Sequence, residues 1–234
     1  MNKIGMGIPI YDDYENLSLI LDEINKLGID YIDFYVLDNG SQKPRLEEYK
    51  SKYGNLNINF LAIPKNLGFG GGIKYLIDKI PNEYIGWMPG NYKVRPIELV
   101  KINDFFENSP TQVFFKAHRV ARSKTAALKT LIGNGIISAI FLRNIQDSGG
   151  TPTIIHRNYR AILFSGPDDF SFEAYCLYVA SAKKWKICRL DINYLERAHG
   201  KSHWQKGMKS EIKLTMRIVS QRKAWKKIVS LEQY

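Results

Sequence analysis

The sequence predicts an α/β fold in which helices flank a mostly parallel central sheet. Short apolar runs alternate along the chain with segments whose apolar residues recur at helical spacing, an order typical of parallel strands joined by right-handed crossovers. The chain has 234 residues, 44% of them hydrophobic, so it can bury a full core. The simplest organisation is one domain over residues 1–204, followed by a basic, amphipathic helical tail over residues 205–234.

The first part of the chain contains three predicted strands. Residues 4–10 form an apolar strand, and apolar residues then recur at helical spacing from Leu17 to Leu27, after which Gly28 can end the helix. Residues 31–37 predict a second strand, and residues 58–63 predict a third. This succession favours neighbouring parallel strands.

A glycine cluster follows the third strand. Asn66 and Gly68 precede Gly70, Gly71 and Gly72 at the start of a predicted helix. The backbone amides of such a turn could face a phosphate, but the spacing matches neither a GxGxxG motif nor a P-loop. Close packing of the helix is therefore the simpler interpretation.

The stretch YIGWMPGNYKVRP, residues 84–96, joins an apolar strand to a polar turn. Residues 84–88 predict a buried strand that ends at a Pro-Gly pair. Asn91, Tyr92 and Lys93 then fall beyond the carboxyl end of the strand, where open α/β sheets bind ligands. Their polar groups could hold an anion or a sugar; an ordinary strand-to-helix turn is the alternative.

The second part of the chain continues the alternation. The pattern predicts helices over residues 96–107 and 126–142, strands over residues 112–117, 151–156 and 187–195, and a further helix that begins near Glu173. Arg119 and Arg122 follow a strand end, where two guanidinium groups could clamp an anion or simply face solvent. Glu173 could serve chemistry, or it could only stabilise the positive end of its helix.

The positive charge is concentrated in the tail. The formal net charge is +11, and residues 201–234 contain nine Lys or Arg against two Glu. Met208, Ile212, Met216 and Val219 recur at helical spacing, which predicts an amphipathic helix. Its apolar stripe could dock on the main domain, pair with a partner protein or a second copy, or contact an anionic membrane. No nucleic-acid-binding motif accompanies the charge, so no nucleic-acid partner is expected.

Cysteine usage and hydropathy predict a cytoplasmic protein. Cys176 and Cys188 fit no metal-binding spacing and lie in apolar segments, as buried thiols in a reducing compartment do. The N-terminus lacks a signal-type apolar core, and no run of about 18 apolar residues is present. We expect a chain that is soluble or peripheral on the inner face of the cell membrane.

Seven short motifs occur in a recognisable order over about residues 4–204. They are IPIYDD with Glu15-Asn16, LDNGS, the turn from Asn66 to Gly72, WMPGN, Arg119-x-x-Arg122, the segment from Phe170 to Glu173, and ERAHGKS. With these motifs the chain resembles family 2 glycosyltransferases of the GT-A fold. The resemblance is nearest to polyprenol-phosphate sugar synthases and to small bacterial transferases of surface-polysaccharide assembly.

The resemblance implies roles for individual positions. Relatives hold the nucleotide base and ribose of a nucleotide-sugar donor at the positions of Pro9, Tyr11, Asp13 and Asp38, and pack beneath the nucleotide at Asn66 and Gly68. The loop that closes over the diphosphate corresponds to Arg197, Gly200, Lys201 and Ser202. Arg119 and Arg122 match a basic motif near the acceptor phosphate, and Glu173 matches an aspartate near the reacting centre.

The sequence departs from this pattern at the metal site. Asn91 and Lys93 stand where relatives have a D-x-D type motif whose carboxylates hold Mg²⁺ or Mn²⁺ against the donor diphosphate. A neutral amide and an ammonium cannot form such a site, because hard cations require oxygen ligands and Lys only donates. Asn144, where many relatives have aspartate, is a further lost carboxylate, and Asp168 and Asp169 are candidate substitute ligands. No metal ligand is therefore assigned.

Two interpretations follow. In the first, Lys93, helped by Arg119, Arg197 and Lys201, supplies the charge of the metal to an inverting glycosyltransferase. The resemblance implies a lipid-linked acceptor, either polyprenyl phosphate or a polyprenyl-linked glycan, in cell-surface polysaccharide or glycoconjugate synthesis. In the second, the chain binds a nucleotide sugar without turnover, as the partner of another transferase. A nucleotidyltransferase is less favoured, because its usual Gly-rich, basic N-terminal signature is missing.

Overall fold

A seven-stranded sheet forms the centre of the molecule. The structure is a computed structural model and describes residues 3–107, 112–121, 123–200 and 208–231. Within these residues the strand order is β3-β2-β1-β4-β7-β5-β8, and a second sheet pairs β6 with β9. The strands are β1 (Ile4–Ile10), β2 (Ile32–Asn39), β3 (Ile58–Ile63), β4 (Tyr84–Trp87), β5 (Phe114–Lys116), β6 (His118–Val120), β7 (Thr153–His156), β8 (Ile187–Cys188) and β9 (Asp191–Asn193).

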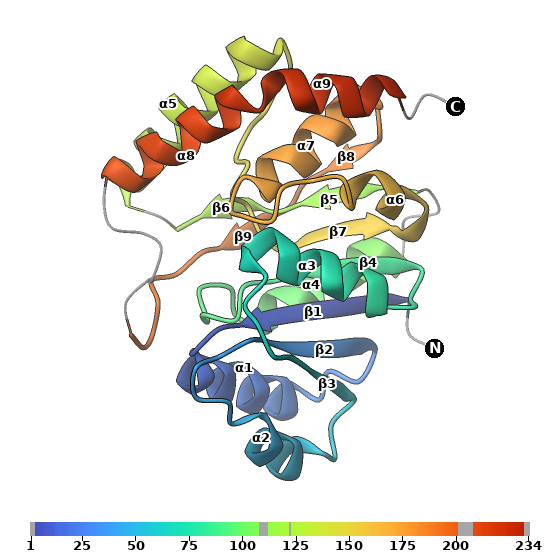
Figure 1. Ribbon diagram of the computed structural model, residues 1–234. Helices are drawn as coiled ribbons and strands as arrows, with labels where there is room; N and C mark the ends of the chain where they lie inside the picture. Colours follow the sequence, from blue (N-terminus) through green and yellow to red (C-terminus); the bar gives the residue numbers. More distant parts are fainter. Residues whose placement is uncertain (1–2, 108–111, 122, 201–207, 232–234) are drawn as a thin grey trace.

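The helices lie on both faces of this sheet, as Figure 1 shows. They are α1 (Tyr14–Leu27), α2 (Leu46–Tyr53), α3 (Gly68–Lys79), α4 (Ile97–Glu107), α5 (Lys124–Phe141), α6 (Arg160–Leu163), α7 (Phe172–Ala182), α8 (Met208–Ser220) and α9 (Arg222–Leu231), with a 3₁₀ turn over Arg157–Tyr159. The predicted α/β fold with a mostly parallel, helix-flanked sheet is confirmed.

The strand directions follow from how the strands are connected. Strands β3, β2, β1 and β4 are parallel neighbours joined through helices, whereas β7 is antiparallel to both β4 and β5. Ile154 of β7 lies opposite Gly86 on one side and Phe115 on the other. The parallel ends of β1, β2 and β4 therefore meet at one edge, where the polar turns of the sequence follow them.

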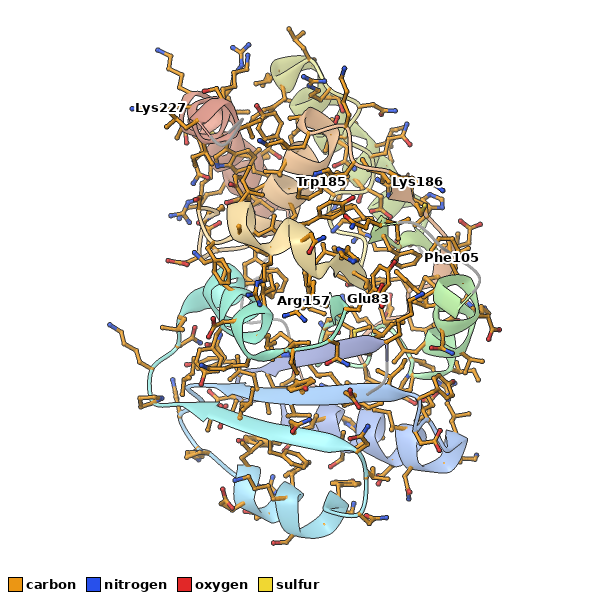
Figure 2. The ribbon with its side chains drawn as sticks, turned by 90° about the vertical axis from the view of Figure 1, so that its right-hand side faces the viewer. Glu83, Phe105, Arg157, Trp185, Lys186 and Lys227 are labelled. Atoms are coloured by element: carbon orange, nitrogen blue, oxygen red, sulfur yellow. The ribbon has the colours of Figure 1, made fainter. Side chains whose placement is uncertain are left out.

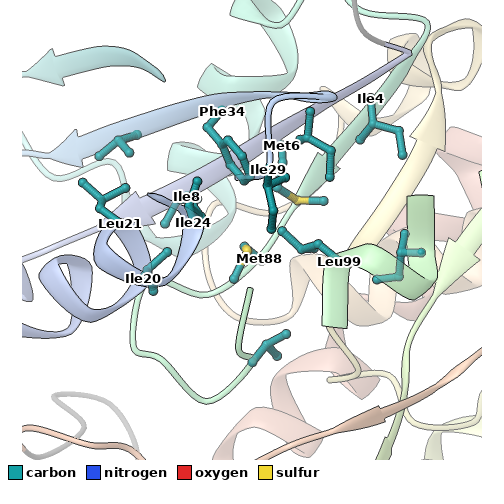
Figure 3. Packing of buried hydrophobic residues seen from close by; sticks show 14 of the residues in the cluster. Ile4, Met6, Ile8, Ile20, Leu21, Ile24, Ile29, Phe34, Met88 and Leu99 are labelled. Atoms are coloured by element: carbon teal, nitrogen blue, oxygen red, sulfur yellow. The ribbon is translucent and has the colours of Figure 1, made fainter. Parts of the chain in front are cut away.

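Two apolar clusters, one on each face, hold the sheet. Strand β1 contributes Met6 and Ile8 to the first cluster, which packs against Ile20 and Ile24 of α1 and against Leu99 of α4 (Figure 3). Helix α1 ends as predicted, because Gly28 adopts a left-handed φ of 61° and its amide donates to the Asn25 carbonyl. The second cluster contains the apolar faces of α3 and α7.

Several predicted elements differ in the structure. Helix α2 was not predicted from any residue pattern. Residues 187–195 do not form one strand: β8 pairs with β5 in the main sheet, and β9 pairs with β6 in the small sheet. The single predicted tail helix is two helices, α8 and α9, which meet at Gln221. The boundary at residue 204 stays a prediction, since residues 201–207 lie outside the described part.

The tail helices pack on α5 and α7 at one end of the molecule, far from α2 (Figure 1). Trp225 of α9 is buried against Phe141 of α5, with ring centres 5.3 Å apart, and against Tyr175 and Tyr178 of α7. The apolar side of α9 thus docks on the main domain, while Lys227 points away from it (Figure 2). Across the described residues, no helix combines the length and apolar character needed to cross a membrane.

Candidate nucleotide-binding site

The ends of β1 and β2 place a buried carboxylate beside α1. Asp38 at the end of β2 is only 2% exposed, and its carboxylate accepts from the Tyr14 hydroxyl at 2.6 Å and from the Ser41 amide at 2.8 Å. Burial, followed by the hydrogen bond to Asp38, raises the pKa of Tyr14 to about 12. Tyr14 therefore remains a neutral donor, and Asp38 is fixed in place.

Pro9 and Tyr11 lie near the same edge. Pro9 of β1 pairs in register with Leu37 of β2, next to Asp38. A side chain added at Gly90 would come within 2.9 Å of the Pro9 carbonyl oxygen, so the turn after β4 passes close to the end of β1. The hydroxyl of Tyr11 accepts from Gln42 at 3.3 Å.

Asp13 is linked to a segment from the far end of the chain. Its carboxylate forms an ion pair with the Arg197 guanidinium and accepts from the Asn16 amide at 2.6 Å. Burial raises the pKa of Asp13, and the contacts with Asn16 and Arg197 oppose this effect. The side chain of Asn16 also exchanges two hydrogen bonds with the backbone of His199, at 3.0 and 3.1 Å. Asp13 and Arg197, both expected at the donor, are brought together.

The glycine cluster packs against another backbone segment, as its simpler interpretation predicts. A side chain added at Gly68 or Gly70 would overlap the carbonyl oxygens of Asp168 and Pro167, and the Gly71 amide donates to the Asp168 carbonyl at 3.1 Å. Gly68 also has a positive φ of 79°. The start of α3 is therefore held close to the segment that leads into α7.

Two asparagines hold the turn in front of α3. The side-chain Nδ2 of Asn39 donates to the Gly68 carbonyl at 3.0 Å, and its Oδ1 accepts from the Leu67 backbone amide at 3.2 Å. The side chain of Asn66 accepts from the Gly68 amide at 2.7 Å. Asn39, which the sequence analysis did not single out, therefore joins the end of β2 to this turn.

The polar turn after β4 is held by a carboxylate from α1. Tyr92, with a φ of 58°, donates its hydroxyl to Glu23 at 2.5 Å, and Arg95 donates to the same carboxylate at 3.0 Å. The side chain of Asn91 accepts from the Lys93 amide at 3.2 Å. Tyr92 is thus committed to Glu23, and Asn91 shapes the turn.

Lys93 and Arg119 both lie close to one aromatic ring. The Lys93 ammonium lies 5.8 Å from the centre of the Tyr194 ring, and the Arg119 guanidinium lies 5.3 Å from the same centre. The Leu195 amide, next to Tyr194, donates to the Lys93 carbonyl at 2.8 Å. The small β6–β9 sheet carries Arg119, and Tyr194 directly follows β9, which explains how residues distant in sequence converge here.

Arg119 is also paired with Asp147. It donates to this carboxylate through its backbone amide at 2.8 Å and its Nε at 2.7 Å, and both side chains are largely buried. Burial alone would raise the pKa of Asp147, but the hydrogen bonds and charge of Arg119 lower it below its ordinary value. The guanidinium therefore lies near the Tyr194 ring and is held in place by Asp147.

Glu173 lies in a buried polar cluster. One carboxylate oxygen accepts from the Trp87 indole at 2.7 Å, and the other is paired with the Lys116 ammonium and accepts from Thr153 at 3.2 Å. Lys116 is fully buried and Glu173 is 6% exposed. Both oxygens of the candidate catalytic carboxylate thus have partners, which come from β4, β5 and β7.

The donor set at the expected metal position does not fit Mg²⁺ or Mn²⁺. Lys93 offers an ammonium, and of the side chains of Asn91, Tyr92 and Lys93 only the amide of Asn91 offers a carbonyl-type oxygen ligand. Asp168 pairs with Lys74 at 2.6 Å, and Asp169 pairs with Arg217 at 2.9 Å. Within the described residues, no group of three or more His, Cys, Asp and Glu is placed to hold a metal ion.

Three predicted site residues, Arg122, Lys201 and Ser202, lie outside the described residues, and their roles stay predictions. Sequence reasoning missed the residues that position the others. These are Glu23, Asn39, Lys116, Asp147 and Tyr194. Lys116 carried a usable signal, because a lysine within an apolar strand needs a buried partner. No sequence signal indicated that Arg119 pairs with Asp147, because the two residues are 28 positions apart.

No protein-family model matches this chain. An uncharacterized protein of Methanocaldococcus jannaschii is 24% identical over 114 residues, which cover 46% of this chain and 48% of that protein. The match therefore spans about half the length of this curated relative.

Solved structures share the fold over nearly the whole chain. The glucosyl-3-phosphoglycerate synthase of Mycobacterium tuberculosis, in complex with Mn²⁺, UDP and glucosyl-3-phosphoglycerate, superposes with a TM-score of 0.70 at 14% identity, covering 96% of this chain and 80% of that one. The complex of the same enzyme with Mn²⁺, UDP and phosphoglyceric acid gives 0.69 at 13% identity, covering 96% and 78%. The chain has the fold of GT-A glycosyltransferases.

Proposed function

We propose that this protein is a glycosyltransferase that takes a sugar from a nucleotide-diphosphate donor. The observation that carries the proposal is the convergence of Lys93 and Arg119 on Tyr194, beyond the carboxyl end of β4. On this fold that is the edge where ligands of open α/β sheets bind. The similar mycobacterial enzyme was solved with UDP and Mn²⁺, so a diphosphate is the ligand chemistry that fits two cations there.

In the proposed mechanism, positively charged side chains of the protein replace the metal ion. The acceptor oxygen forms a bond to the anomeric carbon while the bond to the diphosphate oxygen breaks, and the nucleoside diphosphate leaves with the electron pair. A single displacement of this kind inverts the anomeric centre. Lys93 stabilises the negative charge that develops on the leaving diphosphate. Arg119, which lies near the same Tyr194 ring as Lys93, is positioned to assist. Asp13, Asp38, Pro9 and Tyr11 would surround the nucleoside.

The acceptor we propose is lipid-linked, a polyprenyl phosphate or a polyprenyl-linked glycan. A phosphate acceptor is already an anion at neutral pH and needs no strong base, which is compatible with a Glu173 whose oxygens are both engaged. A sugar hydroxyl would require Glu173 to exchange Lys116 or Thr153 for the acceptor before it could act as a base.

A second function is favoured by two observations. Glu173 is buried in an ion pair, and the turn at Asn91 has no carboxylate to hold a metal ion. Both features suit a chain that binds a nucleotide sugar without turning it over and acts as the partner of another transferase.

The test is a screen of nucleotide sugars with purified protein. Thermal stabilisation reports binding, and mass spectrometry of products with polyprenyl phosphate reports transfer, each with and without chelator. We expect a nucleotide sugar to stabilise the protein in chelator and to be consumed when acceptor is present. Binding without consumption favours the inactive partner, and no stabilisation by any nucleotide sugar rejects both functions.

A further inference from the structure

Helices α5 and α8 present apolar side chains to solvent. Thirteen large apolar side chains of the described residues are exposed, and seven of them belong to α5, to the residue after it, or to α8. These seven are Leu128, Leu131, Ile132, Ile136, Leu142, Ile212 and Met216, between 45% and 77% exposed. We call them the α5–α8 face.

The members from α5 lie along one side of that helix. Leu128, Leu131, Ile132 and Ile136 follow one another at intervals of three, one and four residues, and Leu142 comes directly after the end of the helix. The opposite side, with Ile137 and Phe141, is buried in the second apolar cluster. Helix α5 is therefore apolar on its outer side as well as on its inner side, unlike an ordinary surface helix.

The two helices touch where their exposed stripes adjoin. A side chain added at Gly133 of α5 would meet the Thr215 hydroxyl of α8 at 3.7 Å. Ile132 precedes Gly133 and Met216 follows Thr215, and both are exposed. Figure 1 shows α5 and α8 side by side in the outermost layer of the molecule. The stripes thus belong to one surface.

The charge of this layer is almost entirely positive. Residues 123–146 and 208–231, which include α5, α8 and α9, contain ten Lys or Arg and one acidic residue, Glu211, and so hold most of the formal net charge of +11. Lys129, Arg143 and Lys213 are exposed among the apolar side chains. A second copy of the chain would bring the same positive charge against it, which opposes a symmetric dimer.

We propose that the α5–α8 face docks on the surface of an anionic lipid bilayer. Apolar side chains that lie in the headgroup region, together with basic residues around them, are the chemistry that binds such a surface. Ile212 and Met216 of α8 belong to the predicted tail stripe, but Trp225 and Val229 of α9 are buried in the protein, so most of the apolar contact comes from α5. Docking does not require glycosyl transfer, so either proposal can fail while the other stands.

The test is flotation of the full chain with vesicles of phosphatidylcholine, with and without phosphatidylglycerol, at low salt. We expect binding to the anionic vesicles alone. The variant Leu131→Gln, Ile132→Gln, Met216→Gln should bind at least about tenfold more weakly, because it removes apolar area without emptying the core. The matched control Leu27→Gln, Ile97→Gln, Phe164→Gln changes exposed apolar residues elsewhere and should bind like the unaltered chain.

A second measurement does not depend on these triple variants. A tryptophan placed by Leu131→Trp should shift its emission to shorter wavelength with anionic vesicles, whereas one placed by Ile97→Trp should not. The proposal is overturned if the unaltered chain ignores anionic vesicles at low salt, if both triple variants bind equally, or if the Leu131→Trp emission does not change. Sedimentation velocity that reveals a dimer broken by the α5–α8 triple variant, without vesicle binding, assigns the face to a second copy.

Discussion

The carboxylate of Glu173 is paired with the ammonium of Lys116, a lysine with no solvent exposure. Removing one charge from a buried pair leaves the other without compensation, which costs about 3–5 kcal/mol. Glu173→Gln should therefore lower the free energy of unfolding by this amount, and Lys116→Met added to it should restore most of the loss. Urea unfolding of the two variants checks this. A double variant as unstable as the single one contradicts it.

Lys93 is predicted to bind the donor diphosphate directly. Lys93→Ala should weaken binding of a nucleoside diphosphate by about 1.5–3 kcal/mol, the range of hydrogen bonds to charged groups. Chelator should leave the affinity of the unaltered protein nearly unchanged. Isothermal titration calorimetry measures both, with Lys227→Ala as the control, since Lys227 points to solvent from α9. If binding strictly requires Mn²⁺ and Lys93→Ala leaves the affinity unchanged, a metal ion and not Lys93 binds the diphosphate.

The pair of Asp147 and Arg119 should make stability depend on pH. The pKa of Asp147 in the folded state lies below its ordinary value of 3.8, so the carboxylate contributes stability above that pH and loses it as pH falls through the folded pKa. Asp147→Asn should cost about 3 kcal/mol at pH 7. The difference from the unaltered protein should shrink below pH 3.8.

Urea unfolding across this pH range tests the pair. Glu47→Gln is the control, because the Glu47–Lys50 ion pair is exposed and should contribute less than about 1 kcal/mol. A constant difference between Asp147→Asn and the unaltered protein down to pH 2.5 would mean that the carboxylate does not titrate as described.

Position 70 requires a glycine because the backbone of Pro167 lies too close to leave room for a side chain. Gly70→Ala would push a methyl group into the Pro167 carbonyl, and backbone cannot move aside as a side chain can, so a loss of about 1–3 kcal/mol is expected. Gly135→Ala is the matched change in a helix with open space around it, and it should gain up to about 1 kcal/mol. Thermal unfolding of both variants should give shifts of opposite sign.

Trp225 should anchor α9. Trp225→Ala removes a buried indole that contacts Phe141, Tyr175 and Tyr178, and should cost about 3–5 kcal/mol. Lys226→Ala, next to it and exposed, should change stability little. Equal stability of the two variants in calorimetric unfolding would mean that α9 does not stabilise the domain.

The fold could be predicted wherever local pattern and burial agree. Strands β1 and β3 have the predicted bounds, and α1 ends at Gly28, because continuous apolar runs and a left-handed glycine leave few alternatives. Helix α2 was missed because it is short and rich in charge, so its periodicity is weak. The interruption between Cys188 and Asp191 was missed because alternation does not reveal which sheet a strand joins.

The candidate site was predictable in its positions but not in its partners. Motif order placed Asp38, Lys93 and Arg119 at or after strand ends. The structure has Asp38 at the end of β2 and Lys93 in the turn after β4, but Arg119 lies within strand β6 and not after a strand. The ion pair of Asp13 with Arg197 joins residues 184 apart in sequence, and such pairing depends on tertiary packing that no local pattern encodes. The same holds for Tyr194, whose ring brings Lys93 and Arg119 together.

The side-chain amide of Asn16 donates to the His199 carbonyl and accepts from the His199 backbone amide, so it makes the pair of backbone hydrogen bonds that a neighbouring strand would make. Asp13, one turn away, holds Arg197, so the segment after β9 is tied to the start of α1 at two places. Partial loosening gains little, because the remaining contact keeps the segment in position. Asn16→Ala removes only the contact with His199, so the ion pair of Asp13 with Arg197 should keep the segment beside the start of α1. Both contacts must be lost before the two ends of the described domain can separate at this place.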